Sequence, residues 1–232
     1  MGSGTYTSRR GELETYFDRT ASENWARLTS EAPVSGIRAT VRAGRNAMRE
    51  TLLSWLPEEM AGLRLLDAGC GTGALANEAA RRGAEVVAVD LAGTLIGHAR
   101  ERAAHLGGNQ PDFRVGDMLD ETLGRFDHIV AMDSLIHYKP ADIVDALARV
   151  AARCRGSLIF TVAPQTPLLS VMHAVGRMFP RSDRAPFIEP LAEARLRRLI
   201  AAEPRLSGFA PGRHRRIRSG FYTSHAYEWV RR

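Results

Sequence analysis

The sequence lacks the features that mark several specialised classes of protein. Its two cysteines, Cys70 and Cys154, are too few for a disulfide scaffold or a four-ligand zinc site. No run approaches the roughly 20 apolar residues that span a bilayer, and the polar stretch 1–20 has no hydrophobic signal core. We therefore expect a cytoplasmic protein whose fold depends on an ordinary apolar core.

Lysine is also nearly absent. Lys139 is the only one among 32 basic residues, which face 26 acidic residues, so the formal charge of +6 comes almost wholly from arginine. Arginine pairs with carboxylates and phosphates through two parallel hydrogen bonds. The charge suits an anionic substrate, a lipid surface or a nucleic acid, and equally an arginine-rich proteome.

Strands and helices alternate through the middle of the chain. Short apolar runs predict strands at 63–67, 85–90, 112–115, 126–132 and 157–162. Helical patterns lie between them at 74–82, 94–104 and 141–153. Because the strands show no polar alternation, the pattern indicates an α/β fold whose parallel sheet carries helices on both faces.

Helices are also expected before this core, over 9–30 with an irregular turn and over 35–56. After it, the alternation lapses in a proline-rich segment that we interpret as a lid insertion over the carboxyl ends of the strands. The predicted organisation is an N-terminal helical arm at 1–57, a core at 58–163, the lid insertion at 164–190, and a C-terminal helix and edge hairpin at 191–232.

The end of the chain predicts a helix over 191–202 and then two extended segments within 206–230. We expect Pro211 and Gly212 to join these segments as the turn of the hairpin. The basic run 213–218 would attract an anionic lipid surface or a carboxylate of the substrate, or it would guard an edge strand with charge.

The most informative segment is the glycine-rich turn LLDAGCGTG at 65–73. It has neither the G-x-G-x-x-G of dinucleotide sites nor the Gly-Lys-Ser/Thr of a P-loop, and Asp67 would repel a phosphate. An acid in this position suits a ligand that carries positive charge. The glycines allow the backbone to approach that ligand closely.

Two further acids follow the next two strands. Asp90 ends the second strand, where an acid typically binds ribose hydroxyls. Asp117 follows the third and could accept a hydrogen bond from an adenine amino group, with Leu91 and Met118 against the ring faces. S-adenosyl-L-methionine, a nucleoside with a cationic amino-acid tail and no phosphate, satisfies all three acids.

With VVAVD at 85–90 and GDM at 116–118, this turn makes residues 45–163 resemble the class I S-adenosylmethionine-dependent methyltransferases. The resemblance implies a Rossmann-like, mostly parallel seven-stranded sheet. The expected cofactor-binding residues are Asp67, Gly69, Cys70, Gly71, Gly73, Asp90, Leu91, Asp117, Met118, Met132 and Asp133. For Asp133 two roles stay open, closing the methionine end of the cofactor site or capping the helix that follows.

Flanking motifs narrow the resemblance. They are YFDRT at 16–20, MDSLIHY at 132–138, FTVAP at 160–164 and GFYTS at 220–224. In this order they resemble the magnesium protoporphyrin IX O-methyltransferases of chlorophyll and bacteriochlorophyll synthesis, across about residues 10–227. The resemblance implies methyl transfer to one propionate of Mg-protoporphyrin IX, which gives the monomethyl ester.

The chemistry of that reaction needs no strong base, because a propionate has a pKa near that of Glu, about 4–5, and is already ionised at pH 7. We expect His137 and Tyr16 to orient the propionate by hydrogen bonds, and His137 to deprotonate it at low pH. Their alternative roles are helix capping for His137 and core packing for Tyr16. No protein metal site is expected, since the metal arrives inside the ring; His173 and His214 are weaker candidates for its axial ligand.

Other functions remain in competition. One is a methyltransferase of the same fold that acts on another small acid, a phenol or a quinone, and another is a non-catalytic porphyrin carrier. No nucleic-acid partner is expected, because the fourth strand leads into Met-Asp-Ser-Leu rather than Asn-Pro-Pro-Tyr. The expected partners are the porphyrin-binding subunit of magnesium chelatase and, through the apolar stretch 168–179 and nearby arginines, the surface of the photosynthetic membrane.

Overall fold

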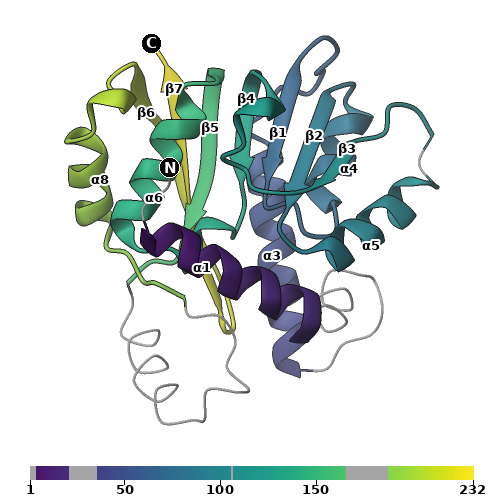
Figure 1. The fold of residues 1–232 in the computed structure, drawn as a ribbon, viewed down its shortest axis with the longest axis horizontal. Helices are drawn as coiled ribbons and strands as arrows, with labels where there is room; N and C mark the ends of the chain where they lie inside the picture. The colour runs from purple at the N-terminus through teal and green to yellow at the C-terminus, as the bar shows by residue number, and fades with distance from the viewer. Residues whose placement is uncertain (1–3, 21–35, 106, 166–187) are drawn as a thin grey trace.

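A computed structural model describes residues 4–20, 36–105, 107–165 and 188–232 of the chain (Figure 1). A single seven-stranded sheet forms the centre, in the order β3-β2-β1-β4-β5-β7-β6. The strands are β1 (Arg64–Ala68), β2 (Glu85–Asp90), β3 (Asp112–Val115), β4 (Phe126–Ala131), β5 (Cys154–Val162), β6 (Phe209–Ser219) and β7 (Tyr222–Arg231). Strands β1 to β5 are parallel, and β7 runs antiparallel to both β5 and β6, so the mostly parallel seven-stranded sheet is confirmed.

Helices cover both faces of the sheet. They are α1 (Gly4–Thr15), the π-helical turn η1 (Tyr16–Thr20), α3 (Gly36–Leu53), α4 (Ala74–Arg81), α5 (Gly93–Ala103), α6 (Pro140–Ala151) and α8 (Glu193–Ala201), with short 3-10 turns η2 (Glu121–Leu123), η3 (Leu135–His137) and η5 (Pro204–Leu206). Side chains of α3, α4 and α5 share one buried apolar cluster, and those of α1, α6 and α8 share the other. Both faces of the inner parallel strands β1, β2, β4 and β5 are therefore largely buried, as their continuous apolar sequence predicts, whereas the edge strand β3 is mostly exposed.

The C-terminal edge hairpin is present, but its predicted turn is wrong. Pro211 and Gly212 lie inside β6, and the chain reverses at Gly220 and Phe221. Strand β6 is the outer strand, and its register with β7 shifts between Pro211 and His214. A proline, which lacks a backbone N–H, is tolerated at such an irregularity of an edge strand.

The N-terminal helix also differs from its predicted bounds, because α1 begins at Gly4 rather than at residue 9. Its first turns bury Tyr6 against the core, and the hydroxyl of the exposed Thr5 donates to the Asp142 carboxylate at 2.8 Å. The expected lid at 164–190 lies almost wholly outside the described residues. Within those residues, no helix combines the length and the apolar character needed to cross a bilayer.

Helix α3 is held against the C-terminal hairpin by close packing. The Ser219 hydroxyl donates to the backbone carbonyl of Thr40 at 2.9 Å. Gly44 faces the ring of Tyr222, and a Cβ built on Gly44 would lie 2.5 Å from Tyr222 Cδ1. This approach places α3 beside the carboxyl ends of the parallel strands (Figure 1).

Substitution of Gly44 tests this packing. We expect Gly44→Ala to lower the free energy of unfolding by about 1–3 kcal/mol, because overpacking against Tyr222 outweighs the better helix propensity of alanine. The matched control is Gly97→Ala in α5, where nothing lies within 4 Å of the added Cβ. There the propensity gain alone should raise stability by about 0.5–1 kcal/mol. Urea denaturation measures both, and a stabilising Gly44→Ala would contradict the packing.

Candidate active site

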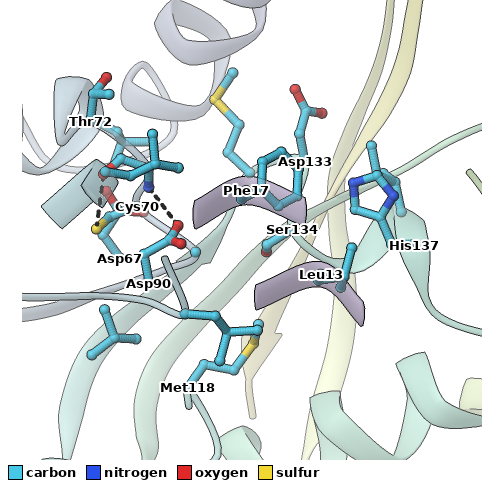
Figure 2. Close-up of a pocket in the computed structure, with 18 of the residues that line it drawn as sticks. Leu13, Phe17, Asp67, Cys70, Thr72, Asp90, Met118, Asp133, Ser134 and His137 are labelled. Atoms are coloured by element: carbon cyan, nitrogen blue, oxygen red, sulfur yellow. Dashed lines mark hydrogen bonds between the residues drawn. The ribbon is translucent and has the colours of Figure 1, made fainter. Parts of the chain in front are cut away.

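A cavity opens at the carboxyl edge of the parallel strands, where the turns after β1, β2, β3 and β4 converge. Residues of α1, η1 and α3 close its sides. Figure 2 shows the carboxylates of Asp67 and Asp90 at one end of the cavity and the His137 ring at the other, with Phe17 between them. Ligands of open α/β sheets bind at this edge.

The glycine-rich turn leads from β1 into α4 through backbone that only glycine adopts readily. Gly69 and Gly71 have φ angles of 84° and 53°. A Cβ on Gly69 would lie 2.3 Å from the Ser134 side chain, so the turn after β1 and the turn after β4 meet without room for a methyl group. Gly71 lines the cavity, and its N–H donates to Asp90 Oδ2 at 2.8 Å.

Gly73 belongs to the same turn, and its predicted contact with the cofactor stays a prediction. It is not among the cavity-lining residues, and its missing Cβ faces the Phe113 ring at 2.7 Å. Its role in the structure is therefore to let α4 pack on the sheet. Cys70 does line the cavity, and burial raises the pKa of its thiol well above the usual value, so it stays protonated and is a weak nucleophile.

Asp67 is the most deeply buried acid of the cavity, with 2% of its surface exposed. Burial and the neighbouring Asp90 raise the pKa of Asp67 to about 7, although a backbone N–H from Ala76 opposes this. Asp67 Oδ2 has no hydrogen-bond partner among the described residues. A buried carboxylate oxygen without a donor fits a ligand that brings a positive charge or an N–H to it.

Asp90 is fixed by the backbone on both oxygens. Oδ2 accepts from Gly71 N at 2.8 Å, and Oδ1 accepts from Ala92 N at 2.9 Å. Each carboxylate oxygen has two lone pairs, so the Asp90 carboxylate keeps acceptor capacity for a ligand hydroxyl. Leu91 follows directly and lines the cavity, as do Met118 and Met132.

Asp117 also lines the cavity, but α1 already contacts its carboxylate. Tyr6 Oη donates to Oδ1 at 2.8 Å, and Arg10 Nη1 donates to Oδ2 at 3.1 Å. The Tyr6 ring stacks on Tyr138 with 4.7 Å between centroids. Sequence reasoning missed Tyr6 and Arg10, because residues 1–10 carry no recognisable motif or clear apolar period.

Asp133 is the centre of a hydrogen-bond network and the only non-glycine residue with positive φ, 54°, among those described. Its carboxylate accepts from Arg45 at 2.8 Å and Tyr222 at 3.0 Å, and from Ser224 and Thr161 at 3.1 Å each. The capping alternative is wrong, because the side chain faces this network rather than the start of α6. The ion pair holds Arg45 at the cavity wall.

His137 and Tyr16 line the same cavity from η3 and η1. His137 is buried, and its ring centroid lies 6.0 Å from that of Phe17, which makes an edge contact with Tyr16 at 5.2 Å. Burial raises the pKa of Tyr16 above its usual value near 10, so its hydroxyl remains a hydrogen-bond donor at neutral pH. Asp18 anchors this turn to α5 by accepting from both Thr94 N and Thr94 Oγ1 at 2.9 Å.

Four arginines of α3 form the wall that sequence reasoning missed. They are Arg38, Arg42, Arg45 and Arg49, here called the arginine row, and all four line the cavity. Their spacing of four, three and four residues puts them on one side of the helix. This spacing and the excess of arginine were visible in the sequence, but nothing in it indicated which side of α3 faces the cavity.

The weaker candidates lie elsewhere. His214, on β6, has its Nδ1 3.3 Å from His225 Nε2 and is not among the cavity-lining residues. His173 lies outside the described residues. Within the described part of the chain, no three His, Cys, Asp or Glu side chains gather to hold a metal ion.

The chemistry of the cavity fits S-adenosyl-L-methionine. Asp67, whose Oδ2 has no partner among the described residues, lines the cavity together with residues of the glycine turn, and Asp90 keeps acceptor capacity for ribose hydroxyls. Neither is paired with a basic side chain of the described residues, so a cationic ligand would neutralise them. A phosphate at this position would meet two buried acids instead.

Comparisons with known proteins agree with this geometry. A family model described as "Magnesium-protoporphyrin IX methyltransferase C-terminus" matches residues 131–231, and one described as "Methyltransferase domain" matches residues 65–156. The chain is 44% identical to a magnesium-protoporphyrin O-methyltransferase of Rhodobacter capsulatus, with 97% of each chain covered.

The chain is also similar to a solved structure and to a relative whose name gives another function. The crystal structure of magnesium protoporphyrin IX methyltransferase from Synechocystis with bound SAH has a TM-score of 0.85 and 28% identity, and covers 97% of this chain and 100% of that one. A ubiquinone biosynthesis O-methyltransferase of Xanthomonas oryzae is 36% identical, over only 57% of this chain and 59% of its own.

The raised pKa of Asp67 predicts that cofactor binding depends on pH. In the free protein Asp67 is half protonated near pH 7, and a cation favours its ionised form. We therefore expect the affinity for S-adenosyl-L-methionine to fall as the pH drops below 7, by up to about tenfold per pH unit. Calorimetric titration at pH 6, 7 and 8 measures this.

Asp67→Asn is the matched variant for that titration, because it keeps the shape and removes the ionisation. It should bind the cofactor more weakly at pH 8 and lose the dependence on pH. A wild-type dissociation constant that stays constant between pH 6 and 8 would contradict the proposed charge pairing.

Proposed function

The chain belongs to the magnesium-protoporphyrin O-methyltransferase family, and we propose that it transfers a methyl group from S-adenosyl-L-methionine to a propionate carboxylate of Mg-protoporphyrin IX. The product is the monomethyl ester, an intermediate of chlorophyll and bacteriochlorophyll synthesis. The observation that carries this proposal is that one cavity has an acidic wall and a basic wall. Asp67 and Asp90 suit a cationic donor, and the arginine row suits an anionic acceptor.

The reaction requires orientation more than proton transfer. When bound, S-adenosyl-L-methionine supplies an electrophilic methyl group on a positively charged sulfur. The acceptor carboxylate is ionised at neutral pH and releases no proton when the ester forms. The protein's task is therefore to hold a carboxylate oxygen in line with the methyl group and to exclude water.

We propose that His137 and Tyr16 hold the reacting carboxylate. Two observations support this: both line the cavity, and both sit on turns fixed by neighbouring elements, since the Phe17 ring contacts each of them. Tyr16 donates a hydrogen bond, because its pKa is raised by burial and it cannot serve as a base at neutral pH. An orienting hydrogen bond must leave one carboxylate oxygen able to attack.

For the cofactor, we propose that Asp67, Gly69, Cys70 and Gly71 surround the methionine end. Asp90 and Leu91 would bind the ribose, and Asp117 and Met118 the adenine side. Met132 and Asp133 would close the site through Arg45. The proposal is supported by the cavity lining and by the acceptor capacity left on Asp67 and Asp90.

An acceptor with a phenol or quinone-derived hydroxyl is the competing function, and the ubiquinone relative is of that kind. Such an acceptor must lose a proton, which would make His137 an obligate base. The arginine row favours the carboxylate instead, because guanidinium groups at the cavity wall suit an anionic acceptor better than a neutral phenol.

We also propose a cytoplasmic enzyme that associates peripherally with the photosynthetic membrane and receives its substrate from the porphyrin-binding subunit of magnesium chelatase. The support is the exposure of two apolar side chains on neighbouring elements, Ile37 at 60% and Phe221 at 48%, close to the arginine row. The division into arm, core, lid and C-terminal unit stays a prediction.

The activity is tested by incubating the purified protein with S-adenosyl-L-methionine and Mg-protoporphyrin IX and detecting the monomethyl ester by mass spectrometry. Absence of the ester, with the cofactor bound, would overturn the proposed function. Activity at saturating cofactor should persist well below pH 6.5, the usual histidine pKa, because no base is required. Loss of activity in proportion to histidine protonation would instead make His137 a base.

The role of His137 is tested by His137→Ala, for which we expect turnover to fall by about 100-fold while cofactor affinity changes by less than about twofold. His137→Gln, which keeps a hydrogen-bond donor, should recover part of the turnover. His98→Ala, at a partly exposed position on α5 outside the cavity, is the control and should change neither quantity. Equal losses of turnover and cofactor affinity would reassign His137 to the cofactor site.

A further inference from the structure

The arginine row extends along one wall of the cavity and differs in character from one end to the other. From Arg38 to Arg49 the helix rises about 16 Å, which is longer than a single carboxylate needs. Arg45 is committed to Asp133 through an ion pair of 2.8 Å between side chains that are 18% and 4% exposed. Its position is therefore set by the protein rather than by a ligand.

Arg49 lies at the cofactor end of the row. Burial lowers the pKa of its guanidinium and the charge of Glu50 opposes this; Arg45 lowers the pKa further, and Glu78 of α4 raises it. Helix α4 begins directly after the glycine turn, so Arg49 belongs to the side of the cavity where the cofactor is expected. Arg45 and Arg49 form the inner half of the row. Arg45 therefore belongs to the Asp133 network, and Arg49 lies on the cofactor side of the cavity.

The outer half of the row, Arg38 and Arg42, differs in its exposure to solvent. Arg38 is exposed, and no described acid lies within ion-pairing distance of it; Arg42 is half-buried one turn further in. Exposed apolar side chains occur at Ile37, next to Arg38 in α3 and 60% exposed, and at Ile188, which lines the cavity and is 37% exposed. Apolar surface beside guanidinium groups matches the edge of a porphyrin that carries its propionates.

From this placement we propose that Arg38 and Arg42 form a second carboxylate subsite, which binds the propionate that is not methylated. The inference rests on the proposed function. The two propionates of protoporphyrin lie on neighbouring pyrrole rings, so both carboxylates point to the same side of the macrocycle. While one faces His137 and Tyr16, the other can pair with the outer arginines through two parallel hydrogen bonds.

This subsite selects a dicarboxylate and explains why methylation stops at one ester. A methyl ester has no charge and cannot form the two charge-assisted hydrogen bonds that a carboxylate accepts from arginine. For a second methylation the product must turn around and present its ester to Arg38 and Arg42. That orientation loses the ion pair, so the monoester is a poor acceptor.

The test compares two acceptors, Mg-protoporphyrin IX and the isomeric monomethyl ester that the enzyme does not make, whose reactive propionate is free. Because the outer arginines are partly exposed, we expect the wild-type KM to be only about tenfold higher for this ester than for the diacid, with similar kcat. In Arg38→Gln/Arg42→Gln the two KM values should become equal. The dissociation constant of S-adenosyl-L-methionine should stay unchanged and show that the variant is folded.

Arg215→Gln is the matched control, because Arg215 is an exposed arginine in the basic stretch of β6 and does not line the cavity. It should keep the wild-type KM ratio. The subsite is overturned if the double variant still prefers the diacid or if Arg215→Gln abolishes the preference. A wild-type protein that methylates neither acceptor would refute the proposed function instead, so the two failures are distinguishable.

Discussion

The buried pair of carboxylates at the ends of β1 and β2 determines the chemistry of the cavity. Asp67 and Asp90 lie beneath the glycine turn, where burial and their mutual repulsion disfavour two negative charges. Backbone N–H groups compensate Asp90 on both oxygens, but one oxygen of Asp67 has no described partner. Such an arrangement costs stability unless a cation completes it. The site is therefore built for a positively charged donor before any acceptor is considered.

Helix α3 supplies the arginines of the same cavity. Helix α3 can approach only because Gly44 leaves room for the Tyr222 ring, and the Tyr222 hydroxyl in turn donates to Asp133. Asp133 then fixes Arg45 in the middle of the arginine row. A packing contact, a backbone position with positive φ and an ion pair together place guanidinium groups of α3 in the same cavity as the strand-end acids. The cavity therefore offers acids from the strand ends to a cationic donor and arginines from α3 to an anionic acceptor.

The sequence was sufficient to predict what depends on local pattern. Local sequence predicts the apolar strands, the glycine turn and the acids that end β1 and β2. These acids were expected to meet, because parallel strands bring their carboxyl ends to one edge of the sheet. The hairpin turn was misplaced, since Pro211 resembles a turn residue unless β6 is known to be an edge strand. The contact of Tyr6 with Asp117 and the side of α3 that faces the cavity depend on tertiary packing between distant segments, which no local pattern encodes.

The most direct measurement is a crystal structure with S-adenosylhomocysteine and Mg-protoporphyrin IX bound together. We expect the cofactor to lie between the glycine turn, Asp67 and Asp90. The two propionates should lie elsewhere in the cavity, one near His137 and one at the outer end of the arginine row. A porphyrin whose propionates contact the basic stretch of β6, or a cofactor displaced from the two acids, would contradict this expectation.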